Sequence, residues 1–210
     1  MYSRICVLGI LIGVFILNGN IVFSQPQNKV EVLKLYDIAI KKYLLPSDDH
    51  SVSILYLEKP SFEPEYSIRI IEFKDSVKLE GDFFKESYWY QLYRHFKQYQ
   101  NAEFEPEVEH YSVLVSKSFN AKMKSVFFQT MESKVSYPST PNGLTVTAVD
   151  GTNYLFRLIN GQNLSLELHE PKSNSLAFKT AAICKEIATS LKINHFDEGK
   201  IIEKINETGY

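Results

Sequence analysis

The sequence predicts an α+β fold in which helices pack on one face of an antiparallel sheet. Apolar residues recur at helical spacing near both ends of the chain, and short alternating runs lie between them. Two tight-turn pairs, Asp150-Gly151 and Asn160-Gly161, stand ten residues apart. Such pairs favour the positive φ angles of two-residue hairpins, so they predict a C-terminal three-stranded meander over 144–149, 154–159 and 164–168.

The N-terminal half alternates helical and extended patterns. Residues 29–45 carry apolar side chains at helical spacing, and Pro46 ends this pattern. Two extended runs, over 51–58 and 66–74, are joined by a proline-bounded loop, which predicts an antiparallel pair. We expect a helix over 83–100, because its aromatic residues follow a period of 3.6.

The middle of the chain predicts one more strand and one more helix. Residues 110–117 alternate as in a strand, and 118–134 fit a helix. The Val-Phe-Phe run leaves a strand over 126–130 open as the alternative. Residues 136–143 are rich in Ser and Pro, so we expect a loop there. This loop is the best candidate for an internal boundary in a single domain that otherwise covers 25–210.

Two helices are predicted to close the chain. Pro171 ends the last strand of the meander, and Ser173 or Asn174 can cap a helix that runs to about Lys192. A shorter helix around 198–206 carries three isoleucines on one side.

Residues 1–24 differ from the rest and indicate a secretory signal peptide. Arg4 is their only charged side chain, and an apolar or glycine run covers 5–17. Val22 and Ser24 are suitable for a cleavage site just after Ser24. An uncleaved anchor over 5–23 is the alternative, at about the lower length limit for a bilayer span. We therefore expect an exported protein, periplasmic or extracellular, that meets a membrane only through an uncleaved N-terminus if at all.

Composition and motifs exclude several functional classes. The formal net charge of -2 argues against a nucleic-acid binder. No two of the five histidines lie within five residues of each other, so the common metal-ligand spacings are absent from the sequence. A Gly-x-Ser-x-Gly nucleophile motif and a glycine-rich phosphate loop are absent as well. We expect no metal and no cofactor, and the sequence leans towards a protein that is not an enzyme.

The aromatic-rich segment 83–104 holds the candidate binding residues. Nine aromatic side chains fall within it, and they permit two interpretations. They form a wide buried face, because aromatics dominate cores by area, or a part-exposed platform for a sugar ring, a peptide or a partner protein. The platform requires Tyr90 and one of Trp89 or Tyr93 to be solvent-accessible. The candidate ligand-binding residues are Tyr88, Trp89, Tyr90, Tyr93 and Arg94.

One short pattern concerns processing. Asp75-Ser76-Val77 matches an acceptor motif for O-glycosylation of exported proteins in some Gram-negative bacteria, which makes Ser76 a candidate modification site. In layout the chain resembles small exported proteins of such bacteria that have no assigned activity. The resemblance lies in the exit of the signal segment, Val22-Phe23-Ser24-Gln25, and in the hairpin at Asp150-Gly151.

Three functional hypotheses follow from the sequence. The leading one is a non-enzymatic exported protein that binds a partner protein, peptide or glycan in the cell envelope. The second is an envelope hydrolase whose acidic or histidine residues are dispersed along the sequence. The third is a structural or assembly module whose strand edge pairs with another chain.

Overall fold

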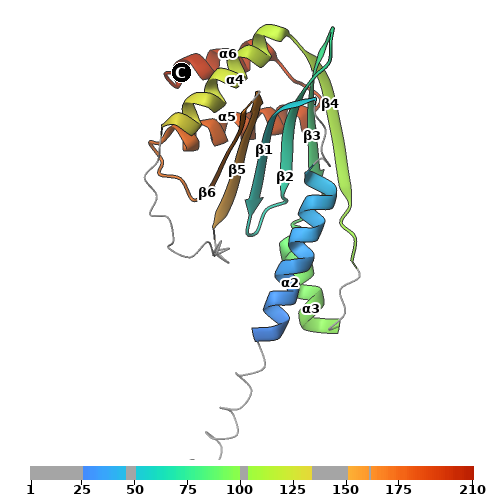
Figure 1. The fold of residues 1–210 in the computed structure, drawn as a ribbon. Helices are drawn as coiled ribbons and strands as arrows, with labels where there is room; N and C mark the ends of the chain where they lie inside the picture. The colour runs from blue at the N-terminus through green and yellow to red at the C-terminus, as the bar shows by residue number, and fades with distance from the viewer. Residues whose placement is uncertain (1–25, 46–50, 100–103, 134–150, 161) are drawn as a thin grey trace, which may run out of the picture.

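A computed structural model describes residues 26–45, 51–99, 104–133, 151–160 and 162–210. At its centre lies an open six-stranded antiparallel sheet with the strand order β4-β3-β2-β1-β5-β6 (Figure 1). The strands are β1 (Val52–Pro60), β2 (Tyr66–Glu72), β3 (Val77–Phe84), β4 (Val108–Val115), β5 (Thr152–Asn160) and β6 (Gln162–His169). The prediction of an α+β fold with an antiparallel sheet is confirmed.

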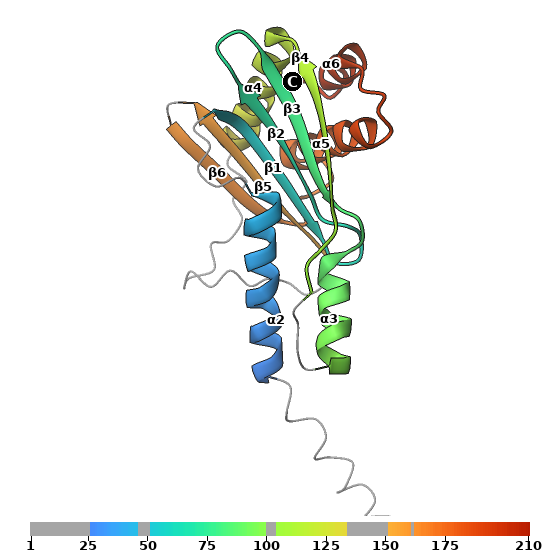
Figure 2. The same ribbon diagram turned by 90° about the vertical axis from the view of Figure 1, so that its right-hand side faces the viewer.

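The helices form two groups around this sheet. One group covers a face of the sheet and consists of α4 (Lys117–Glu132), α5 (Leu176–Lys192) and α6 (Glu198–Glu207). The other group consists of α2 (Pro26–Ala39), its π-helical continuation η2 (Ile40–Leu44) and α3 (Tyr88–Tyr99). Figure 2 shows α2 and α3 side by side, extending beyond one end of the sheet.

The main core lies between one face of the sheet and the helices α4, α5 and α6. Alternate residues of the central strands point into it, including Tyr56 of β1 and Phe156 of β5. The helices contribute apolar stripes with Phe127 from α4 and Ile187 from α5. Cys184, the one free cysteine of the described residues, is also buried in this core.

A second, smaller core lies on the opposite face of the sheet. Leu57 of β1 and Phe84 of β3 meet Tyr36 of α2, Leu44 of η2 and Leu92 of α3 there. Neighbouring strand residues point to opposite faces, so Leu57 and Tyr56 serve the two different cores. The expectation that the helices pack on one face only is therefore wrong, because α2, η2 and α3 pack against the opposite face.

Strand β3 was not predicted, and it changes the expected helix over 83–100. Phe83 and Phe84 are the last residues of β3, and the helix begins only at Tyr88. The two phenylalanines face opposite sides of the sheet, with Phe83 in the main core and Phe84 in the second. The helix over 118–134 is confirmed as α4, which makes the alternative strand over 126–130 wrong.

The meander prediction is half confirmed. Strands β5 and β6 form the predicted hairpin around position 161. The other edge of β5 pairs with β1 from Ile54 to Pro60, so it is not free to pair with 144–149. Residues 1–25, which include the predicted signal peptide and cleavage site, and 134–150 lie outside the described residues.

Candidate functional site

The start of α3 is held by a buried carboxylate. Glu65 precedes β2, is fully buried, and accepts hydrogen bonds from the backbone N–H groups of Tyr88 and Trp89, both at 2.9 Å. A carboxylate at this place satisfies donors that have no partner within the helix and complements the positive end of its dipole. Burial raises the pKa of Glu65, and these two bonds together with one from the side chain of Tyr36 oppose that rise. Glu65 thus fixes α3 to the sheet and to α2.

One side of α3 is part of the second core. Tyr88 is 4% exposed, its ring stacks on Tyr36 and Phe104, and its hydroxyl donates to the carbonyl of Phe104 at 2.9 Å. Leu92, one turn further along, is fully buried beside it. The buried-face interpretation therefore applies to Tyr88, which has no surface left for a ligand.

The other side of α3 is exposed. Tyr90 is 52% exposed and Tyr93 is 54% exposed, and Arg94 is exposed as well. Residues three and four apart lie on one helical face, so these three side chains are neighbours. Trp89 is half-buried, with its ring edge-on to Tyr36 at 5.3 Å between centroids. The accessibility that the platform requires is present at Tyr90 and Tyr93.

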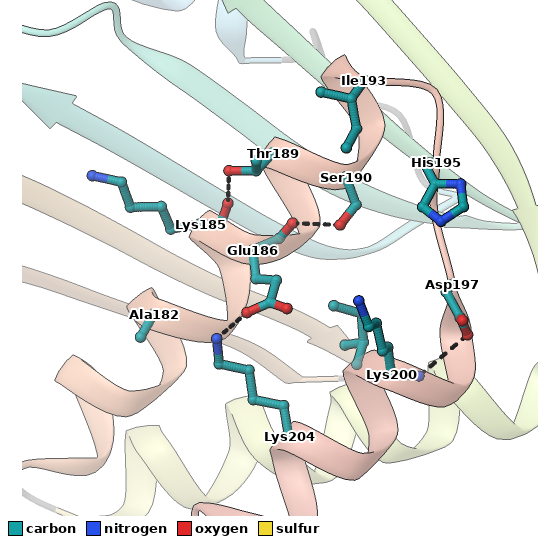
Figure 3. Close-up of a pocket in the computed structure, with 11 residues that line it drawn as sticks. Ala182, Lys185, Glu186, Thr189, Ser190, Ile193, His195, Asp197, Lys200 and Lys204 are labelled. Carbon is teal, nitrogen blue, oxygen red and sulfur yellow. Dashed lines mark hydrogen bonds and ion pairs between the residues drawn. The ribbon is translucent and has the colours of Figure 1, made fainter.

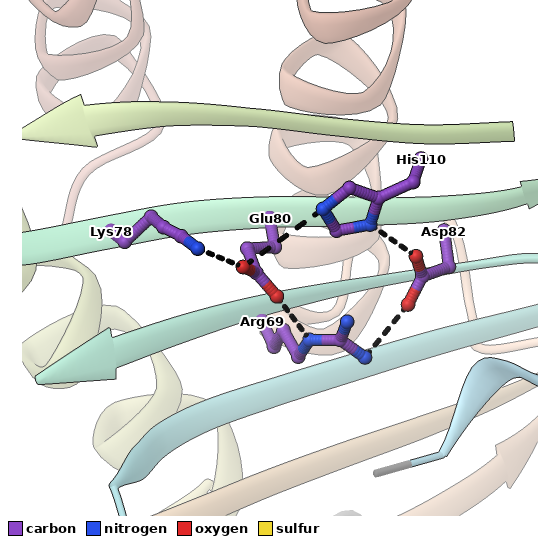
Figure 4. Close-up of polar contacts among 5 residues, drawn as sticks. All are labelled: Arg69, Lys78, Glu80, Asp82 and His110. Carbon is purple, nitrogen blue, oxygen red and sulfur yellow. Dashed lines mark hydrogen bonds and ion pairs between the residues drawn. The ribbon is translucent and has the colours of Figure 1, made fainter.

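A network of charged side chains lies on the sheet face opposite α4, α5 and α6 (Figure 4). Arg69 of β2 binds Glu80 at 2.8 Å and Asp82 at 2.7 Å, and both acids belong to β3. Lys78 binds Glu80 at 2.6 Å, and Nδ1 of His110 on β4 lies 2.6 Å from Asp82. Sequence reasoning missed this cluster, although the alternation of charged and apolar residues over 77–83 is a signal that could have found it.

Ser67 lies next to this network and, with Asp82 and His110, completes the three residue types of a serine-hydrolase triad. Their order across the sheet differs from the order that such a triad needs. Ser67, Asp82 and His110 are register neighbours on β2, β3 and β4, so the acid stands between the serine and the histidine. Serine hydrolases need the histidine in the middle, where it can take the proton of the serine. Ser67 Oγ is buried and has no hydrogen-bond partner among the described residues. The row therefore cannot activate Ser67.

The charged groups of the network neutralise one another through ion pairs. Burial acts to raise the pKa of Glu80, but hydrogen bonds from Lys78 and Arg69 outweigh it, so this pKa is lowered and the carboxylate stays ionised. Arg69 lies between Glu80 and Asp82, while His110 carries the contact on to β4 (Figure 4). These contacts link the side chains of three neighbouring strands, β2, β3 and β4.

A hollow of about 490 Å³ lies between α5 and α6 (Figure 3). Its hydroxyl groups are used inside α5: Thr189 donates to the carbonyl of Lys185, and Ser190 donates to that of Glu186. The side chain of Glu186 is paired with Lys204 of α6. Both hydroxyls thus donate to backbone carbonyls of their own helix, and the Glu186–Lys204 pair joins α5 to α6.

Within the described ranges, no group of three or more His, Cys, Asp or Glu side chains is placed to hold a metal ion. None of the helices described is both long and apolar enough to cross a bilayer.

The candidate modification residue, Ser76, lies half-buried in the turn between β2 and β3.

Comparison with models of protein families, with curated proteins and with solved structures gives no match for this chain. The fold alone does not imply a function, since functions depend on the side chains of a site. The function of this chain therefore depends on the side chains of the surfaces described above.

Proposed function

We propose that this chain is a non-enzymatic exported protein that binds a partner protein or peptide through the exposed face of α3. The observation that carries the proposal is the exposure of Tyr90 and Tyr93, both above one half, beside Arg94 on one helical face. Tyrosine and arginine are the residue types enriched at the energetic centres of protein interfaces. Export depends on the signal-like residues 1–24.

The support of α3 makes this face suitable for binding. Glu65 holds its first turn, and Tyr88 and Leu92 anchor its other side in the second core. A surface that is already ordered loses less conformational entropy when a partner binds. The exposed tyrosines therefore contribute contact area from a fixed position.

The shape of the surface favours a protein or peptide over a glycan. The exposed face of a helix is convex, whereas small ligands are bound in concave sites that bury most of their surface. The hollow between α5 and α6 contains no residue of α3. The hydrolase alternative, which relies on dispersed acidic or histidine residues, has less support, because the acids Glu80 and Asp82 of the sheet network are paired with Arg69. The histidine of the network, His110, is likewise paired with Asp82.

We expect the double variant Tyr90→Ala/Tyr93→Ala to lose the partner while keeping its stability. Both side chains are largely exposed, so the free energy of unfolding should change by no more than about 0.5 kcal/mol per substitution. Loss of two such contacts should weaken binding by about tenfold to a thousandfold. The measurement is a pull-down from an extract of the cell envelope, followed by titration of the retained protein.

The matched control is Phe178→Ala, which removes a comparably exposed aromatic from α5. It should retain the same partner with the same affinity as the unchanged chain. Retention of one identical set of proteins by the unchanged chain and both variants would refute the role of α3. Retention of a glycan instead of a protein would refute the choice of ligand class.

A further inference from the structure

We propose that a second site, the pocket at Glu58, binds a primary ammonium group carried on a short aliphatic chain. This site contains no residue of α3, so the test of the site is independent of the test of the proposed function. Its parts come from the end of β1, the loop that follows it, the start of β5 and the middle of α5.

The pocket has a volume of about 230 Å³, which suits a small ligand or a single side chain. Its walls include Glu58, Ser61, Tyr154 and Lys185. Ser61 Oγ donates to the carbonyl of Gly151 at 2.7 Å, which ties the loop after β1 to the residue before β5. The walls are therefore held together by a contact between segments far apart in the sequence.

Gly151 is required at its place in this wall. Its φ of 106° is unfavourable for residues with a side chain. A Cβ at this position would also lie 2.3 Å from a carboxylate oxygen of Glu170 and 2.6 Å from the ring of His169. The pair Asp150-Gly151, predicted as a hairpin turn, thus supplies a glycine that lets the backbone pass close to the end of β6.

Glu58 is a buried acid without an ion-pair partner among the described residues. The residue is 4% exposed. Its Oε2 atom accepts hydrogen bonds from the hydroxyls of Tyr56 at 2.6 Å and Tyr66 at 2.5 Å. Neither tyrosine uses Oε1. The neighbouring Lys59 pairs with Glu167 instead, at 3.5 Å. A buried carboxylate with only neutral donors is costly, and a cation in the adjoining pocket would compensate its charge.

The surroundings of Glu58 favour a cation. Burial raises the pKa of Tyr154, and the nearby charges of Glu58, Glu170 and Glu63 raise it further, as expected where carboxylates surround a phenol. Lys185 is the one cation of the pocket lining, and it pairs with Glu63 at 3.4 Å. With Lys185 paired to Glu63, Glu58 is the acid of the lining that has no ion-pair partner among the described residues.

The aromatic residues of the pocket fit the chain that carries the ammonium group. Phe62 lines the pocket although it is 73% exposed, and Tyr154 forms part of the opposite wall. Aromatic rings cover alkyl chains and attract cations through their faces. A metal ion is a poorer occupant, because no cluster of three acidic, histidine or cysteine ligands is found among the described residues.

An ammonium group of this kind has two sources, a small free amine or a lysine side chain of another protein. Calorimetric titration of the purified protein distinguishes them with two probes, n-butylammonium and the peptide acetyl-Gly-Lys-Gly-amide. Binding of n-butylammonium alone supports a free amine. Binding of the peptide, with equal or higher affinity, supports a lysine. n-Pentanol, which lacks the charge, should give no binding heat.

Three substitutions test the role of the charge. Glu58→Gln keeps an oxygen for the two tyrosines and should weaken binding of n-butylammonium by about tenfold to a hundredfold, the loss of one hydrogen bond to a charged group. Lys185→Gln removes the competing cation and should strengthen binding. Glu203→Gln, on the exposed side of α6 and away from the pocket lining, should leave affinity unchanged.

The proposal is overturned if neither probe binds, if n-pentanol binds as well as the amine, or if Glu58→Gln leaves affinity intact. Thermal unfolding of each variant shows that it is folded. If Glu58→Gln does not fold, the decision passes to Lys185→Gln together with n-pentanol, and unchanged affinity in Lys185→Gln then counts against the site.

Discussion

Replacing Glu65 with alanine should lower the free energy of unfolding by about 2–3 kcal/mol, because it leaves one buried and one part-buried backbone donor without a partner. These donors are the N–H groups of Tyr88 and Trp89 at the start of α3. Trp89 is the only tryptophan of the chain, so its fluorescence reports on this turn. We expect a red shift of its emission and an earlier midpoint in urea unfolding followed by the same signal.

Glu65→Gln is the matched control, since it keeps an acceptor oxygen and removes the charge. Its loss of stability should be smaller than that of Glu65→Ala. Equal stability of the unchanged chain and Glu65→Ala would contradict the assignment of Glu65 as the group that holds α3.

The same control reveals the effect of pH. Burial raises the pKa of Glu65 in the folded chain, against the opposing bonds from Trp89, Tyr88 and Tyr36. The folded state then keeps a proton that the unfolded state releases, so this group's contribution to stability falls as pH rises from about 4.3 through the raised value. Glu65→Gln lacks this contribution. The difference in unfolding free energy between the two proteins should therefore shift in favour of Glu65→Gln as pH rises towards 7.

Replacing Phe156 with alanine should lower the free energy of unfolding by about 3–5 kcal/mol. Phe156 is fully buried on β5 at the centre of the main core, with the rings of Tyr56 and Phe127 at 5.3 and 5.9 Å between centroids. Removing the ring leaves a cavity that rigid aromatic neighbours cannot fill. Urea unfolding followed by circular dichroism measures this loss.

Phe178→Ala provides the comparison for Phe156→Ala. Phe178 is 42% exposed at the start of α5, so its removal should change stability by no more than about 0.5 kcal/mol. Similar losses in the two variants would contradict the position of the core.

Local patterns predicted most helices, the antiparallel β1–β2 pair and the β5–β6 hairpin, but not the remaining strand neighbours. The helix over 118–134 was predicted because its apolar stripe repeats over four turns. The pair Asn160-Gly161 predicted the β5–β6 hairpin, since turn chemistry is local. The same chemistry does not specify the other neighbour of β5, which is β1, about one hundred residues earlier in the chain.

Strand β3 illustrates how one pattern can hide another. The predicted helix over 83–100 includes Phe83 and Phe84 because they adjoin the aromatic residues from Tyr88 onward that follow a helical period. In the structure they end a strand and enter two different cores, an outcome set by long-range packing on both faces of the sheet.

The candidate site could be predicted in part. Tyr90, Tyr93 and Arg94 are candidate binding residues on the sequence alone, and all three are exposed. The burial of Tyr88 depends on α2, which packs against it from far along the chain. Glu65 was missed, because it lies 23 residues before Tyr88 and nothing in its local sequence indicates a role at the start of α3.

The claim that the exposed face of α3 binds a protein partner is tested most directly by crosslinking in intact cells. The photoreactive residue p-benzoylphenylalanine replaces Tyr90, Tyr93 or, as the control, Phe178. We expect positions 90 and 93 to yield the same crosslinked protein on illumination and position 178 to yield none. The absence of a crosslink at both positions of α3, or an identical crosslink at position 178, would contradict the account.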